Sequence, residues 1–97
     1  MRFEWDERKA TANLLKHGIR FEDAITAFDD PWALRAPDAA HSTVEEERHW
    51  LIGESDSAVV VLVFTERQPG RVTRIISAQP ANRKERLRYD ESKRIAL

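Results

Sequence analysis

At 97 residues and 11.3 kDa the chain is long enough for one modest hydrophobic core and too short for two, so we expect a single domain over residues 1–97. It has no cysteine, which excludes disulfides and thiolate zinc clusters. Its longest apolar run, residues 58–64, is far shorter than the ~20 residues that span a bilayer. No charged-then-apolar leader opens the chain, so we expect a cytoplasmic protein without membrane contacts.

The formal net charge of −1 conceals a separation of charge along the chain. Residues 67–97 carry nine Lys and Arg against three Asp and Glu, a charge of +6. This asymmetry favours a polyanion-binding face on an otherwise acidic body. A solvated helix whose charges serve only solubility is the alternative.

The first third of the chain predicts a short strand at residues 3–5 and a helix that follows it. Asp6 is a suitable N-cap, the helix continues through His17, and Gly18 is the expected C′ residue. On a helical wheel the predicted packing face holds Ala10, Thr11, Leu14 and Leu15, and the polar face holds Lys9, Asn13 and Lys16.

A second helix is predicted over residues 21–28 from apolar side chains at i, i+3, i+4 and i+7. Residues 32–35 favour a short strand, and residues 36–46 read as a polar loop that contains His41. We interpret His41 as a loop residue and His49 as a sheet-face residue rather than as metal ligands.

Three strands are predicted next, at residues 48–53, 58–66 and 72–78. Their short connections favour an antiparallel meander. The run at 58–64 is apolar at every position, as in a central strand covered on both faces. Simple alternation along the last strand groups Arg74 with Ile76 and Ala78 on one face.

Pro80 then ends the sheet, and Asn82 with Glu85 forms a capping-box start for a final basic helix. Leu87 and Tyr89 are the only large apolar residues of this helix before Ile95, so it has little to bury. The predicted fold class is α+β, with a small antiparallel sheet, two N-terminal helices and a C-terminal basic helix.

Several kinds of catalytic site find no support in the sequence. There is no phosphate-binding glycine loop and no zinc-type spacing, and nothing marks a Ser, His and Asp triad. The acidic runs at 29–30 and 45–47 are poor metal cages because adjacent side chains diverge, so we expect no metal and no cofactor.

The cations near strand ends and on the final helix suit RNA cleavage. RNA carries its own nucleophile, the 2′-hydroxyl, and arginine stabilises the charge that develops on phosphorus but cannot act as a base. The residue types available for proton transfer are His17, Lys9, Glu85 and Tyr89. For His17, a helix-dipole role beside Gly18 is an equally good interpretation.

Motifs at both ends of the chain carry a family resemblance. FEWDERKATANLLKHGIRFEDA at 3–24, Glu47-Arg48, Phe64-Thr65 and RIISAQPANRKERLRYD at 74–90 together resemble the BrnT family of ribonuclease toxins. The resemblance implies a RelE-like fold, cofactor-free RNA cleavage that arrests translation, and neutralisation by a cognate BrnA-type antitoxin. It also implies that operator DNA is bound only through the antitoxin. Family members often have a basic residue where this chain has Gln79.

We therefore expect a metal-independent endoribonuclease toxin of a type II toxin–antitoxin pair. The predicted catalytic residues are Arg67, Arg74 and Arg83, which would hold the scissile phosphate, with His17 and Lys9 for proton transfer or RNA positioning. The predicted RNA-binding residues are Arg86, Lys84, Asn13 and Ser77. Two alternatives stay open: a non-catalytic nucleic-acid-binding module, and a basic docking surface for an acidic protein.

Overall fold

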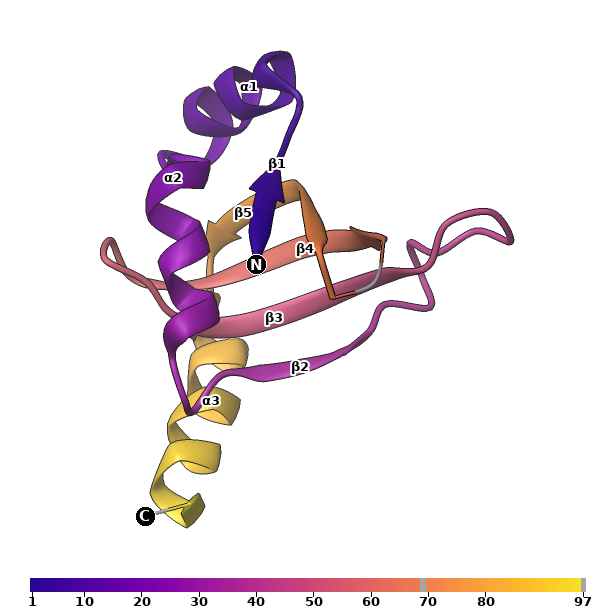
Figure 1. Cartoon of the computed structure of the whole chain (residues 1–97). Coiled ribbons are helices and arrows are strands. Elements are labelled where there is room, and N and C mark those ends of the chain that lie inside the picture. Colours follow the sequence, from indigo (N-terminus) through magenta and orange to yellow (C-terminus); the bar gives the residue numbers. More distant parts are fainter. Residues whose placement is uncertain (69, 97) are drawn as a thin grey trace.

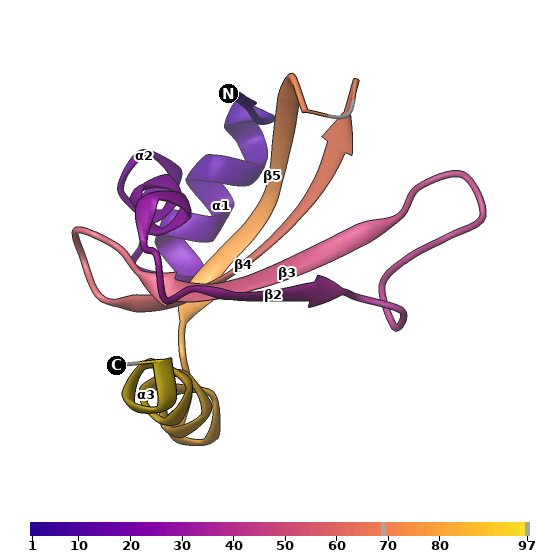
Figure 2. The same cartoon turned by 60° about the horizontal axis from the view of Figure 1, so that its bottom comes forward.

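The computed structural model describes residues 1–68 and 70–96 and has one five-stranded sheet with helices on both faces (Figures 1 and 2). The strands are β1 (Arg2–Glu4), β2 (Leu34–Pro37), β3 (Arg48–Glu54), β4 (Val59–Arg67) and β5 (Val72–Pro80). The helices are α1 (Glu7–His17), α2 (Phe21–Ala24), the 3₁₀ helix η1 (Ile25–Asp29) and α3 (Arg83–Ala96). The predicted α+β class is confirmed.

The strand order is β1-β5-β4-β3-β2. The predicted meander is confirmed, because β3, β4 and β5 pair antiparallel in succession. β2 adds an antiparallel edge, and β1 pairs parallel with β5 at the other edge. The apolar strand β4 is accordingly central, as its sequence predicts.

Helix α1 has the predicted caps. The Asp6 side chain accepts hydrogen bonds from the backbone N–H groups of Arg8 and Lys9, at 2.8 and 3.4 Å. Gly18 adopts a left-handed conformation with φ 71° and donates its N–H to the Leu14 carbonyl at 2.8 Å. Both ends of the helix are therefore set by local sequence.

The predicted faces of α1 are partly wrong. Leu15 is 84 % exposed, whereas Asn13 is buried at 7 % exposure. The Asn13 amide donates to the carbonyls of Ile19 and Ala78, and its oxygen accepts from the Ala78 N–H. An amide with these three bonds can replace an apolar residue at the interface of α1 and β5.

The predicted second helix is shorter than expected. α2 covers only Phe21–Ala24, and the chain then tightens into η1. The β-branched residues Ile25 and Thr26 lie at this change, and the Thr26 hydroxyl donates to the Asp23 carbonyl at 2.6 Å. Such side-chain bonds compete with regular α-helical pairing.

One face of the sheet, which we call the helix-covered face, packs against α1, α2 and η1 (Figure 2). Its core contains, among others, Phe21, Leu51, Leu62, Phe64 and Ile75, all at most 3 % exposed. This packing fixes which side chains of β3, β4 and β5 point to the opposite side.

A β-bulge in β5 corrects the predicted alternation. Val63 of β4 pairs with Ser77 and Phe64 pairs with Ile75, so Ile76 is an extra residue without a partner of its own. Arg74 therefore shares a face with Ser77, and Ala78 lies with Ile75 in the helix-covered core. The grouping of Arg74 with Ile76 and Ala78 was wrong because simple alternation does not anticipate a bulge.

We call the opposite side of the sheet the open face, because α3 covers it at one end only (Figure 2). There Tyr89, 2 % exposed, packs with Ile52, Val61 and Ala81. The predicted capping box is confirmed by the reciprocal bonds of Asn82 and Glu85, both 2.8 Å. Within the described residues, no helix is long and apolar enough to cross a membrane.

Candidate nucleic-acid interface on the open face

Two predicted arginines meet at the end of the open face that is far from α3. Arg74 pairs with Glu4 of β1 and with Thr65 of β4, and Arg67 lies two residues beyond Thr65, so all four side chains share the open face. The Arg74 Nη1 atom is 2.7 Å from the Glu4 Oε2 atom, and the Arg67 Nε atom is 4.0 Å from the same oxygen. Two guanidinium groups thus converge on one carboxylate.

This cluster of two arginines and one glutamate is partly open to solvent. The Arg67 side chain is 57 % exposed, and those of Arg74 and Glu4 are 29 and 32 % exposed. Guanidinium groups bind carboxylate and phosphate oxygens with the same donors. A phosphate that displaced Glu4 would meet both arginines.

A groove of about 250 Å³ lies on the open face beside α3. It is lined by Asp38, His41, Trp50, Ile52, Val61, Val63, Gln79, Glu85 and Arg88. The Arg88 guanidinium carbon is 5.6 Å from the centre of the Trp50 ring, which is within cation–π range. The groove therefore combines an apolar floor with one arginine and one histidine at its walls.

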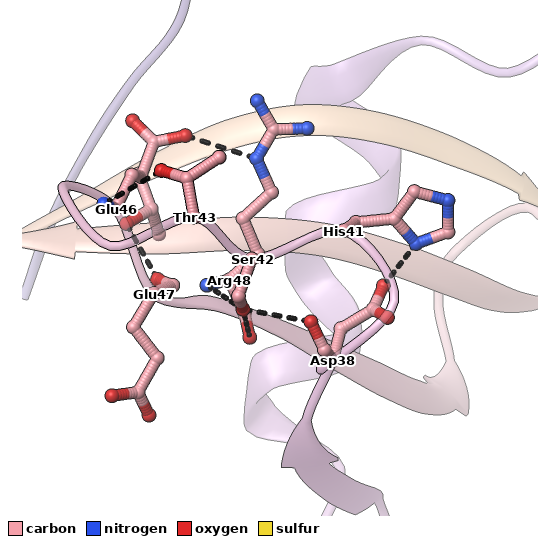
Figure 3. A network of polar contacts seen from close by, with 8 residues as sticks. Asp38, His41, Ser42, Thr43, Glu46, Glu47 and Arg48 are labelled. Atoms are coloured by element: carbon pink, nitrogen blue, oxygen red, sulfur yellow. Dashed lines mark hydrogen bonds and ion pairs between the residues drawn. The ribbon is translucent and has the colours of Figure 1, made fainter.

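His41 is held at this groove by the loop between β2 and β3 (Figure 3). Its Nδ1 atom is 2.7 Å from the Asp38 Oδ2 atom. The imidazole is 64 % exposed and the Asp38 side chain only 12 %. The interpretation of His41 as a loop residue is confirmed, but its pairing with Asp38 was not foreseen. The sequence signal that could have indicated this pairing was an aspartate three residues before a histidine in a polar loop.

Two other candidates for proton transfer are held by structural contacts. Glu85 accepts the Asn82 N–H in the capping box while it lines the groove. Tyr89 donates its hydroxyl to the Asp30 Oδ2 atom at 2.5 Å, and burial together with this bond raises the tyrosine pKa above its ordinary value. Tyr89 therefore joins α3 to the sheet.

The remaining predicted arginines lie elsewhere. Arg83 and Arg86 line a separate hollow of about 330 Å³ with Ala81, Leu87 and Asp90. At 100° per residue, Arg83 and Arg86 fall on one flank of α3 and Arg88 falls on the other. The structure thus brings Arg83 and Arg86 together, as predicted, but not beside Arg67 and Arg74. Lys84 is exposed in the first turn of α3.

The other predicted residues are divided between the two sides of the sheet. Ser77 is on the open face opposite Val63. Lys9 and His17 belong to α1, which packs on the helix-covered side. Asn13 is buried with its amide fully used by backbone partners, so its geometry gives no support to a role in RNA binding.

A further hollow of about 420 Å³ lies at the ends of β3 and β4, where Arg67 and His49 meet the acidic residues 45–47. His49 stacks on Phe64 with ring centres 5.6 Å apart, and its Nε2 atom is 3.4 Å from the Glu47 Oε1 atom. Among the residues that the structure describes, no group of three or more His, Asp or Glu is arranged to hold a metal ion.

Comparison with known proteins gives the chain a family. Residues 5–85 match the family described as the ribonuclease toxin, BrnT, of type II toxin–antitoxin systems. A search of curated proteins finds no match. The matched segment contains Asp38, His41, Gln79 and Glu85, and it ends before Arg88. Since the match covers most of the chain, the protein belongs to the BrnT family of ribonuclease toxins of type II toxin–antitoxin systems.

Proposed function

We propose that this BrnT family member is a metal-independent endoribonuclease that binds single-stranded RNA along the open face. The observation that carries the proposal is the presence of arginines at both ends of that face, Arg67 with Arg74 at one end and Arg88 at the other. Arg74 and Gln79 pair with Thr65 and Val61, which are four residues apart on β4, roughly 13 Å at the rise of a strand. An RNA segment of a few nucleotides fits this distance.

The chemistry proposed for this face needs only RNA and protein side chains. The 2′-hydroxyl attacks the adjacent phosphorus, and arginine stabilises the charge that builds on the phosphoryl oxygens. Trp50, which lines the groove, offers an aromatic surface on which a base can stack. In this proposal RNA cleavage arrests translation.

The family also supports a protein partner, since a type II system pairs its toxin with an antitoxin protein. We propose that a cognate BrnA-type antitoxin neutralises this protein. The antitoxin would also make any contact of the complex with operator DNA. Arg83, Arg86 and Lys84 stay candidates for contacts outside the groove, with RNA or with an acidic partner surface.

The test is RNA cleavage by the purified, partner-free protein in EDTA. We expect fragments that end in a 2′,3′-cyclic phosphate, and no cleavage of a matched substrate with 2′-deoxyribose at the cleaved position. The control for contaminating nucleases is the Arg67→Gln/Arg74→Gln double variant, purified identically. This variant should bind RNA more weakly and cleave it more slowly, whereas a contaminating nuclease would cut RNA equally in both preparations.

Two results would overturn this proposal. RNA that stays intact in EDTA and is cut after Mg²⁺ is added would exclude the metal-independent mechanism. RNA that is bound but never cut under either condition would favour the non-catalytic binding module.

A further inference from the structure

The loop that carries His41 is fixed by hydrogen bonds. The Ser42 hydroxyl donates to the Asp38 carbonyl at 2.7 Å and accepts the Arg48 N–H at 2.8 Å, which ties the turn to the first residue of β3 (Figure 3). The Asp38 N–H in turn donates to the Arg48 carbonyl at 2.7 Å. The imidazole is therefore presented by a defined turn although it is itself exposed.

The Asp38 carboxylate determines which imidazole nitrogen is free. An ionised carboxylate only accepts hydrogen bonds, so the Nδ1 atom at 2.7 Å carries a proton. In the neutral ring the Nε2 atom is then an unprotonated acceptor. A nearly buried carboxylate that orients an exposed imidazole is the arrangement that general bases use in enzymes.

The groove next to the imidazole can take a phosphodiester. Arg88 supplies positive charge there and is aligned by its contact with Trp50. The charged or titratable groups that line the groove with His41 are Asp38 from its own loop and Glu85 and Arg88 from α3. Glu85 already accepts the Asn82 N–H in the capping box. We therefore take the Nε2 atom of His41 as the proton acceptor in the groove.

The other histidines lack this combination. His17 ends α1 on the helix-covered side, and His49 is stacked on Phe64. Only His41 of the three histidines in the sequence lines the groove on the open face with an arginine.

We propose that His41 is the general base of the RNA cleavage reaction and that Asp38 is its positioning residue. The Nε2 atom takes the proton of the 2′-hydroxyl while that oxygen forms a bond to phosphorus. The bond between phosphorus and the 5′-oxygen breaks, and the 5′-oxygen leaves with the electron pair and takes a proton from water. The products are a 2′,3′-cyclic phosphate and a free 5′-hydroxyl, and Arg88 binds the phosphate throughout. This inference rests on the proposed ribonuclease function.

The experiment compares wild type, His41→Ala and His17→Ala in EDTA on one RNA, with His49→Gln as a purification-matched control. We expect His41→Ala to lower kcat by 10²- to 10⁴-fold, the usual contribution of a general base, with RNA affinity within threefold of wild type. Added imidazole should restore part of the activity of His41→Ala, which a merely structural defect would not allow.

Asp38→Asn tests the positioning role. We expect kcat to fall at least tenfold with KM within threefold of wild type, and imidazole should not rescue this variant because its own ring is still present.

Melting temperatures should stay close to wild type for the His41 variant, whose side chain is exposed.

The outcomes separate the two proposals. If wild type cleaves RNA in EDTA and His41→Ala cleaves within threefold of it, the assignment of His41 is overturned and the nuclease function stands. If His17→Ala loses activity and His41→Ala does not, the base is on α1 instead. If wild type does not cleave in EDTA, the metal-independent function fails and the assignment of His41 fails with it.

Discussion

Gln79 stands where the family resemblance led us to expect a basic residue. It lines the groove with His41 and Glu85. Asp38 and Glu85 are also at its walls, and among the described residues that line this groove Arg88 is the one fixed positive charge. A neutral side chain at position 79 therefore leaves the proposed phosphate site poor in charge.

We expect Gln79→Arg to increase RNA cleavage about tenfold, because a second guanidinium would stabilise the charge that develops on phosphorus. Steady-state rates on a single RNA measure the effect. Gln79→Met, of similar length and without charge, is the matched control and should not gain activity. An unchanged rate in the arginine variant would mean that position 79 does not reach the reacting phosphate.

Glu4 is the residue that occupies the two arginines at the other end of the open face. Because its carboxylate is 32 % exposed, its ion pair with Arg74 is partly screened by solvent. We expect Glu4→Gln to strengthen RNA binding two- to fivefold, since it frees Arg67 and Arg74, and Arg74→Gln to weaken binding. Fluorescence anisotropy with a labelled RNA measures both. Weaker binding by Glu4→Gln would indicate that the carboxylate holds the arginines in place for RNA.

Helix α3 has two flanks with different surroundings. Arg88 faces the groove, whereas Arg83 and Arg86 line a hollow on the other flank. The positive charge at the end of the chain is therefore divided between two surfaces rather than gathered at one phosphate.

We expect Arg88→Ala to lower cleavage by at least tenfold and Arg83→Ala/Arg86→Ala to change it by less than threefold. The comparison uses kcat for the wild type and both variants on the same RNA, with helix content checked by circular dichroism. A larger loss of kcat in the double variant than in Arg88→Ala would indicate that Arg83 and Arg86 belong to the catalytic site.

The elements predicted best from sequence are those fixed by neighbouring residues. The Asp6 and Gly18 caps and the Asn82–Glu85 box act within one helical turn, so their sequence patterns were sufficient. Asn13 was assigned to the wrong face because its partner, Ala78, is 65 residues away. The groove beside His41 was not foreseen for a similar reason, since it forms only when β4, β5 and α3 come together.

On the scale of the whole molecule, the hydrogen bond between Tyr89 and Asp30 connects α3 to the rest of the fold. Asp30 accepts the Tyr89 hydroxyl and also the N–H groups of Trp32 and Glu54. Burial alone would raise the Asp30 pKa, but these hydrogen bonds outweigh it and hold the pKa below its ordinary value of 3.8. One carboxylate thus joins η1, β3 and α3.

This contact makes stability depend on pH with a defined sign. A carboxyl group with a depressed pKa in the folded state stabilises the fold above its unfolded pKa, and this stabilisation is lost as pH falls below that value toward the folded pKa. We expect Asp30→Asn to lower the free energy of unfolding by about 2 kcal/mol at pH 7. The difference from wild type should shrink below pH ~4.

Urea unfolding at pH 7, 5 and 3 measures this dependence. Tyr89→Phe is the control, because it removes the hydroxyl and leaves the Asp30 carboxylate with its two backbone donors. It should destabilise by about 1 kcal/mol and keep most of the pH dependence. A constant difference between Asp30→Asn and wild type at all three pH values would contradict the assigned role of the carboxylate.

The bulge at Ile76 has a consequence for how β5 can vary in length. Since Ile76 has no partner residue of its own on β4, its deletion would leave Ser77 paired with Val63 and Ile75 paired with Phe64. Arg74 would stay on the open face and Ala78 in the helix-covered core. β5 is thus one residue longer than its pairing with β4 requires. Deletion of Ile76 would leave all the remaining side chains of the strand on the faces that they have now.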